Sequence, residues 1–348
     1  MTSTTVYGAL PGGQSGANAA PDFGDPRGEF QALLSGCGLY DLSWRAKIAV
    51  TGGDRVRWMN GMVTNNVRDL ASGRGVYAFM LNAKGQIQAD LYIFQRGDSL
   101  LVDAELGQRD KILQLFDRYI IADDVEVTDV SDKLTALGLT GPESRSTLER
   151  AGIAVPELAH LQWADAVWQQ GSQPKTITVL RSGEEARESW QLWVALGLAQ
   201  ELAEALHKAG ARATGTAALN LFRISRGIPQ FGIDIRERDI PQETGQIRAL
   251  NFTKGCYLGQ EIVERIRSRG AVHRLFSAFA VEGELPAPAT KIVASNEDKE
   301  VGEITSSVVL PLPGGDCPAA LGYLRREAVG KELRAGDAIL KVVTPPII

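Results

Sequence analysis

One segment of the sequence combines residue types that could make a thiol reactive. Cys256 lies between two glycines in Lys-Gly-Cys-Tyr-Leu-Gly-Gln-Glu, residues 254–261, and Lys254 precedes it by two positions. Glycines allow a loop backbone angles that are closed to other residues and let a ligand approach the main chain. The pattern from Gln260 to Ile266 is typical of a helix, so Cys256 is expected just before a helix N-terminus. Backbone amides there and the ammonium of Lys254 would favour the nucleophilic thiolate over the thiol.

On the residues alone a second interpretation of Cys256 stays open, since most free cysteines are small buried hydrophobic residues. The other two cysteines, Cys37 and Cys317, lie far from it in the sequence. An odd number of widely spaced cysteines indicates neither a disulfide framework nor a paired-cysteine metal site and favours a reducing compartment. The sequence also predicts no zinc site and no Ser/His/Asp triad, because its three histidines are scattered over unrelated elements: His160, His207 and His273.

A basic cluster follows the expected helix start: Arg265, Arg267, Arg269, His273 and Arg274. It is either an ordinary solvated helix face or an anion site, for a chain of carboxylates or an RNA phosphate. The whole chain has 37 basic and 42 acidic side chains, a net charge of -5, so a general basic field for nucleic acid is absent. Without an RNA-reading motif, the sequence argues against direct tRNA binding.

The composition is that of an ordinary globular protein, with 348 residues of which 44% are hydrophobic and 23% charged. No window approaches the roughly 18 uninterrupted apolar residues of a membrane helix, so no membrane contact is expected. The first basic residue is Arg27, which leaves no room for the charged start of a secretory signal or transit peptide. We therefore expect a cytoplasmic protein. Residues 1–27 are rich in Gly, Ala, Pro and Ser and predict a flexible tail.

Mixed elements must position this chemistry. The patterns predict a strand at residues 47–50, a helix at 54–62, and a hairpin of residues 76–81 and 88–94 around a turn at 82–85, with Asp90 in the middle of its second strand. Amphipathic helices are expected around residues 112–119 and 198–206. After Arg274 five short β runs follow, which indicates a small antiparallel barrel or sandwich and a boundary near residues 270–274.

The segment 254–261, followed by Arg265 and by Arg269 with Gly270, resembles the signature of the YgfZ folate-binding family. That family is similar in fold to the glycine cleavage T-protein, an aminomethyltransferase. Stretches of the N-terminal half resemble the part that both share: residues 38–43, 48–52, 64–67 and 82–91. Residues 223–224, 227–229 and 322–325 also match, so the likeness runs from about residue 28 to the C-terminus.

The resemblance implies an α+β, T-protein-like fold of several lobes around a central folate cleft, with a C-terminal antiparallel β-barrel. It divides the chain into a tail at 1–27, a folate-binding domain of two lobes at 28–272 and a barrel domain at 273–348. The implied cofactor is tetrahydrofolate or a derivative. The implied partners are a reduced folate and iron–sulfur client proteins, tRNA-modifying enzymes among them.

The resemblance also assigns roles to residues. Asp90 matches the key acid of the T-protein and would meet the N–H donors of the pterin edge with paired hydrogen bonds. Arg223 matches a T-protein arginine and would meet a carboxylate of the folate glutamate. Cys256 and Lys254 would be the reactive pair. The other signature residues are expected on the folate side of the site: Tyr257, Gln260, Glu261 and Arg265.

Three functions follow as hypotheses. The first is a folate-binding accessory protein for assembly or repair of iron–sulfur clusters. The second is a tetrahydrofolate-dependent aminomethyltransferase or demethylase, although Ser225 replaces the glutamate that follows the matching T-protein arginine, and the T-protein's acidic Tyr-Thr-Gly-Glu stretch is missing. The third is a structural scaffold in which Cys256 is buried and inert.

Overall fold

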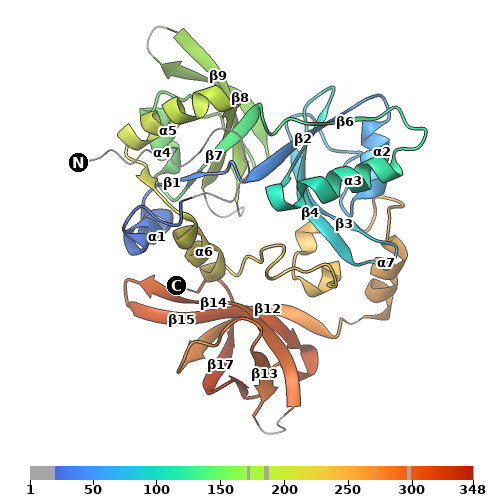
Figure 1. Ribbon diagram of the computed structural model, residues 1–348, viewed down its shortest axis with the longest axis vertical. Helices are drawn as coiled ribbons and strands as arrows, with labels where there is room; N and C mark the ends of the chain where they lie inside the picture. The colour runs from blue at the N-terminus through green and yellow to red at the C-terminus, as the bar shows by residue number, and fades with distance from the viewer. Residues whose placement is uncertain (1–19, 171–172, 184–187, 271, 296–298, 348) are drawn as a thin grey trace. The chain divides into compact units, whose positions relative to one another are not determined.

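The computed structural model describes residues 20–170, 173–183, 188–270, 272–295 and 299–347 (Figure 1). The chain forms two compact units: one contains Met1–Asn60, Asn66–Tyr77 and Leu91–Leu219, and the other contains Gly61–Asn65, Ala78–Asp90 and Asn220–Ile348. The expected tail, residues 1–27, lies outside the described residues up to residue 19, and helix α1 (Pro26–Ser35) begins at its end. No helix among the described residues is both long and apolar enough to cross a membrane.

A five-stranded sheet contains the predicted strand and hairpin. Its order is β3 (Gly75–Leu81), β4 (Ile87–Gln95), β5 (Leu100–Glu105), β2 (Arg45–Thr51) and β6 (Glu126–Asp129). The antiparallel partners β2 and β5 place Lys47 opposite Asp103, and both side chains are fully buried as an ion pair of 3.2 Å. The expected helices are also present, as α2 (Arg55–Met62) and α3 (Arg109–Tyr119).

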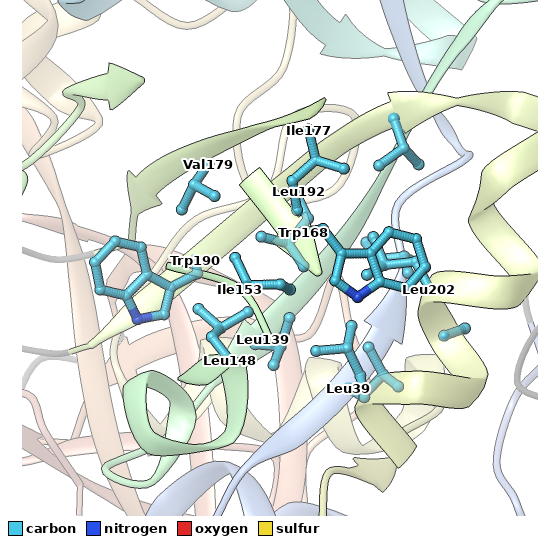
Figure 2. Packing of buried hydrophobic residues seen from close by; sticks show 14 of the residues in the cluster. Leu39, Leu139, Leu148, Ile153, Trp168, Ile177, Val179, Trp190, Leu192 and Leu202 are labelled. Carbon is cyan, nitrogen blue, oxygen red and sulfur yellow. The ribbon is translucent and has the colours of Figure 1, made fainter. Parts of the chain in front are cut away.

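A six-stranded sheet has its own hydrophobic core. The strand order is β11 (Arg212–Ala213), β1 (Gly38–Asp41), β7 (Leu134–Thr140), β10 (Ser189–Ala195), β9 (Gln173–Ser182) and β8 (Trp163–Gln170). Trp168 and Trp190 are fully buried in this core, with side chains of β7, β9, β10 and helix α5 (Ala199–Lys208) around them (Figure 2). Helix α5 confirms the prediction from leucines at helical spacing, because Leu202 and Leu206 both lie in this core. Helix α4 (Ser144–Arg150) contributes Leu148.

The C-terminal part is a closed antiparallel barrel, as predicted. The strands follow one another in the order β12 (Arg274–Glu282), β15 (Gly315–Arg325), β14 (Lys299–Leu312), β13 (Lys291–Ala294), β16 (Leu333–Ala335) and β17 (Ala338–Val343). Closure leaves no sheet edge unpaired, and the interior is filled by apolar side chains such as Phe279, Ile304 and Leu324. The sequence patterns missed β16, which has only three residues. The predicted α+β fold with a C-terminal barrel is confirmed.

Between residue 216 and the barrel the chain is mostly loops and short helices. They are α6 (Thr216–Ser225), the 3-10 turns Pro241–Glu243 and Ile247–Ala249, and α7 (Gln260–Arg269). Three further 3-10 turns are Leu106–Gln108, Leu196–Leu198 and Arg326–Ala328. The loop that carries Cys256 joins the turn Ile247–Ala249 to α7.

Candidate functional site

The loop that carries Cys256 is fastened by its backbone to residues 61–65. The amide of Asn251 donates to the carbonyl of Thr64 at 3.0 Å, and the amide of Leu258 donates to the carbonyl of Gly61 at 3.1 Å. The hydroxyl of Thr64 donates to the carbonyl of Ala249 at 2.6 Å. These bonds hold both ends of the loop, which we call the cysteine loop (residues 251–259), so its conformation depends on a segment that is distant in sequence.

Lys254 is a buried anchor of the cysteine loop. Its side chain is 5% exposed, and its ammonium donates to the carbonyl of Val63 at 2.8 Å and lies 4.8 Å from the centre of the Tyr257 ring. A buried ammonium needs such partners because desolvation without them is costly. The expected action of this ammonium on the Cys256 thiol stays a prediction.

The thiol of Cys256 is exposed, so the alternative that this cysteine is a core residue is wrong. Helix α7 begins at Gln260, as predicted, and the residue before it, Gly259, has a left-handed φ of 81°. A Cβ at Gly259 would lie 2.6 Å from the carbonyl oxygen of Asn82, so only glycine fits this close approach to the β3–β4 turn. The turn and the helix start together fix where Cys256 emerges at the surface.

Tyr257 and Glu264 lie on the inner side of the cysteine loop and α7. Tyr257 is 8% exposed, and its burial, with the nearby charge of Glu264, raises the pKa of its hydroxyl to about 12. The amide of Gln260 donates to the carbonyl of Tyr257 at 3.2 Å and closes the turn into α7. Tyr257 is therefore neutral at physiological pH and acts here as part of the loop's packing.

The predicted basic cluster divides into exposed and internal members. Arg265 is half exposed and pairs with the exposed Glu261 at 2.7 Å, one turn earlier on α7. Arg267 lies 4.6 Å from the centre of the Phe252 ring. Arg274, in contrast, is bound inside the second unit to Asp239 and Glu243 at 2.7 and 2.9 Å. His273 is exposed, and the side chain of Arg269 lies outside the described residues. The five residues do not form one continuous solvated face.

Arg223 holds α6 to neighbouring parts of the second unit. Its guanidinium donates to Asp234 at 2.6 Å, to the hydroxyl of Ser306 on β14 at 3.0 Å, to Asn220 at 2.8 Å and to the carbonyl of Ile228 at 3.4 Å. Four of its five N–H donors thus have partners within the chain. A folate carboxylate could meet Arg223 only through the remaining donor or by displacing one of these partners.

Asp234 is the centre of this arrangement, and the sequence patterns missed it. Its carboxylate is fully buried and accepts bonds from Arg223, from the amide of Gln230 and from the hydroxyls of Thr305 and Ser306. The two hydroxyls lie at a β-bulge of β14, which turns consecutive side chains toward the same carboxylate. A buried carboxylate of this kind needs about as many donors as it has here.

Asp90 is a half-buried carboxylate in the middle of β4. Residues along β4 alternate between buried and half-buried, and Asp90 shares the half-buried face with Gln88. The sheet order places β4 between β3 and β5, so Asp90 is not on an edge strand. A carboxylate in this position has the chemistry to accept paired N–H donors, and that role for Asp90 stays a prediction.

Arg236, which sequence reasoning also passed over, carries buried donors without a partner. Its Nη1 donates to Glu303 at 2.6 Å, and its backbone amide donates to Asp239 at 2.7 Å. Its Nε and Nη2 are buried and have no hydrogen-bond partner among the described residues. The only sequence signal was the run Arg236-Glu237-Arg238 in a loop.

Two side-chain oxygens, one on α7 and one of a side chain bonded to it, are also buried without a partner among the described residues. Gln242 donates through Nε2 to the carbonyl of Val263 at 2.9 Å, while its Oε1 is buried and unpaired within the described ranges. Oε1 of Glu264 is likewise buried and unpaired there. No group of three or more His, Cys, Asp or Glu side chains in the described part of the chain has the arrangement of a metal site.

The comparisons with known proteins agree with this architecture. The family model described as "GCVT N-terminal domain" matches residues 15–254, and the one described as "CAF17, C-terminal beta-barrel domain" matches residues 273–348. The glycine cleavage system aminomethyltransferase T from Bartonella henselae superposes with a TM-score of 0.85 at 22% identity, over 98% of this chain and 94% of that one. The fold therefore defines a chain of the glycine cleavage T-protein class with a closed C-terminal barrel.

Curated relatives align with this chain over most of the length of both proteins. The chain is 24% identical over 333 residues to an aminomethyltransferase of Halalkalibacterium halodurans, covering 93% of this chain and 90% of the relative. It is 27% identical over 320 residues to an aminomethyltransferase of Geobacillus kaustophilus, covering 89% and 86%. Because the first model spans well over half of the chain, the protein belongs to the GCVT N-terminal domain family, in the form that carries a CAF17-type barrel.

Proposed function

We propose that this protein is a folate-binding accessory factor that supports assembly or repair of iron–sulfur clusters in client enzymes, tRNA-modifying ones among them. The observation that carries the proposal is the exposed thiol of Cys256 on an anchored loop between the two matched regions. The segment around it resembles the YgfZ signature. In this proposal residues 28–272 bind the folate and residues 273–348 form the barrel domain.

The chemistry of the second unit's unpaired groups fits a reduced folate. A pterin edge presents N–H donors, and the buried acceptors Gln242 Oε1 and Glu264 Oε1 lack donors within the described residues. Asp90, half-buried on β4, is the carboxylate that the resemblance assigns to the pterin edge. The glutamate end of a folate carries carboxylates, which match the unpaired donors of Arg236. When bound, tetrahydrofolate or a derivative would supply one-carbon chemistry, and these residues would bind and orient it.

A single exposed thiol is suited to binding an iron–sulfur cluster transiently. Iron–sulfur clusters are usually held by four thiolates, so Cys256 alone provides one ligand and the others would come from the client. Such a partial site favours passing a cluster on over storing it. In this proposal Lys254 keeps the cysteine loop in place through its bond to the carbonyl of Val63. The exposed pair Glu261 and Arg265 on α7 stays a proposed part of the folate site, as the resemblance implies.

The test replaces the sulfur of Cys256 by oxygen and keeps the shape of the side chain. Cys256→Ser should keep folding and tetrahydrofolate affinity, because the side chain is exposed, and should lose support of cluster-dependent enzymes in cells deleted for this protein. Cys317→Ser is the matched control and should restore those enzymes fully. Normal cluster-enzyme activity with the Cys256 variant would remove the thiol from the mechanism, and absence of tetrahydrofolate binding by the natural chain would remove the folate.

A tetrahydrofolate-dependent aminomethyltransferase is the second candidate, and the names of the curated relatives favour it. Ser225 argues against it, because its hydroxyl is turned back onto the carbonyl of Phe222 at 2.8 Å where the T-protein sequence has a glutamate. Transfer of a one-carbon unit from an aminomethyl donor to tetrahydrofolate by the purified chain, retained in Cys256→Ser, would establish this alternative.

A further inference from the structure

We propose that Arg236, with Arg238 and Lys291 beside it, is the subsite for the glutamate carboxylates of the bound folate. The inference rests on the proposed folate binding and assigns the tail to a different arginine from Arg223. It follows from a comparison of the N–H donors that are still unpaired in the guanidinium groups of Arg236 and Arg223.

The geometry of the guanidinium decides which ligand Arg236 can take. Nε–H and one Nη2–H point the same way from one edge of the planar group, and this pair matches the two oxygens of a carboxylate. In Arg236 both of these nitrogens are buried without a partner in the described part of the chain, while the opposite nitrogen, Nη1, is bonded to Glu303. In Arg223 the Nε and Nη2 atoms already donate to Asn220 and Ser306.

The surrounding charge favours an anion. Arg236, Arg238 and Lys291 all contact Glu303, at 2.6, 3.5 and 2.9 Å. Lys291 also pairs with Glu300 at 3.1 Å, so three cations face two carboxylates. Burial raises the pKa of Glu303, but hydrogen bonds from Lys291 and Arg236 outweigh it and lower the pKa to about 2. Glu303 is therefore ionised, and one positive charge of the cluster remains for a ligand.

The position links this cluster to the strand that carries Asp90. The buried carboxylate of Asp239 accepts from the amide of Arg236, and the carbonyl of Asp239 accepts from the amide of Ile87 at 3.0 Å. Ile87 precedes Asp90 by three residues on β4. Arg238 and Lys291 are 58% and 51% exposed, more than Arg236 at 28%, so they suit the additional carboxylates of a poly-γ-glutamate tail.

The experiment compares the affinity for tetrahydrofolate with the affinity for its pterin part alone. Tetrahydrofolate and tetrahydropterin, which lacks the glutamate, are titrated into the natural chain and into Arg236→Gln. Arg325→Gln, at a half-exposed arginine of the barrel, is the control. Arg236→Gln should weaken tetrahydrofolate about 10- to 100-fold, the usual size for a charged bidentate pair, and leave tetrahydropterin unchanged. Arg325→Gln should change neither affinity. Melting temperatures establish that each variant is folded.

The outcomes separate the subsite from the folate itself. If the natural chain binds both ligands and Arg236→Gln changes neither affinity, the unpaired donors hold internal water only and the subsite is wrong. Equal losses for both ligands would also overturn it, because they indicate a general effect on the fold. If the natural chain binds neither ligand, the proposed folate function fails first. A larger gain from a triglutamate tail in the natural chain than in an Arg238→Gln, Lys291→Gln variant would support the cluster's wider role.

Discussion

At the scale of single residues, the three cysteines have different surroundings. Cys256 is exposed, Cys317 is half-buried and Cys37 is buried, with a pKa that burial raises above its ordinary value. Alkylation at neutral pH should therefore modify Cys256 first and Cys37 last. Mass spectrometry of a timed iodoacetamide reaction measures the order. Faster labelling of Cys37 than of Cys256 would contradict the exposures on which the proposed function depends.

Arg223 should matter for stability more than for ligand binding. Arg223→Ala leaves the fully buried carboxylate of Asp234 without its cation, and removal of one partner from a buried pair typically costs about 3–5 kcal/mol. Denaturant unfolding measures the loss. Arg226→Ala, a neighbouring change on the same turn of chain, is the comparison and should cost less. A stable Arg223→Ala protein with much weaker tetrahydrofolate binding would return the tail subsite to Arg223.

Residue types predicted where the thiol lies in the chain, but not the partners of the charged side chains near it. The glycines and the helical pattern after Cys256 were sufficient to place the thiol before α7. They could not show that Lys254 is bonded to Val63, 191 positions away, or that Arg223 is bonded to Asp234 and β14. Such pairings depend on which segments the fold brings together, and a single sequence does not contain that information in any local pattern.

At the scale of elements, the start of α7 depends on a glycine with no room for a side chain. Gly259 and Gly270 flank the same helix, both with left-handed φ, but a Cβ at Gly270 would meet no atom of the described residues within 4 Å. Both alanine variants should lose about 1 kcal/mol from backbone strain. Gly259→Ala should lose distinctly more, because its Cβ would press on the Asn82 carbonyl. Paired urea titrations compare the two, and equal losses would contradict the close approach.

The barrel carries a pH-dependent contribution from Glu303. Its pKa is lowered from 4.5 to about 2, so the contribution is fully present above about pH 4.5 and is lost as the pH falls toward 2. A shift of this size corresponds to about 3 kcal/mol. Unfolding of Glu303→Gln should show a smaller drop in stability between pH 5 and pH 3 than the natural chain does. Parallel curves for the two proteins would contradict the shift.

Elements were predicted well wherever the pattern was long. The β3–β4 hairpin, helices α3 and α5 and the long strands of the barrel all have clear periodicity. β16 has three residues and forms only because β13 and β17 pair with it on either side, so tertiary structure and not local preference makes it a strand. The turns and loops between residues 226 and 259 have no period to detect, and they contain Arg236 and Asp234.

At the scale of the whole molecule, Lys254 connects parts of the chain that are far apart in sequence. Lys254→Met removes the bond to the Val63 carbonyl, so backbone amides that hold the cysteine loop to residues 61–65 should exchange with solvent faster, those of Asn251 and Leu258 above all. Hydrogen exchange read by mass spectrometry measures this. Lys84→Met, on an exposed lysine of the second unit, is the control. Unchanged exchange in both variants would show that the backbone bonds alone hold the loop.

The second unit is assembled from segments that are synthesised at different times. Two of its segments, Gly61–Asn65 and Ala78–Asp90, leave the ribosome more than a hundred residues before the rest, which begins at Asn220. Until then the carbonyls of Gly61, Val63 and Thr64 lack the hydrogen-bond donors that the cysteine loop supplies. The thiol of Cys256 therefore reaches its anchored position only late in translation, and a nascent chain halted before that point would have no organised cysteine loop.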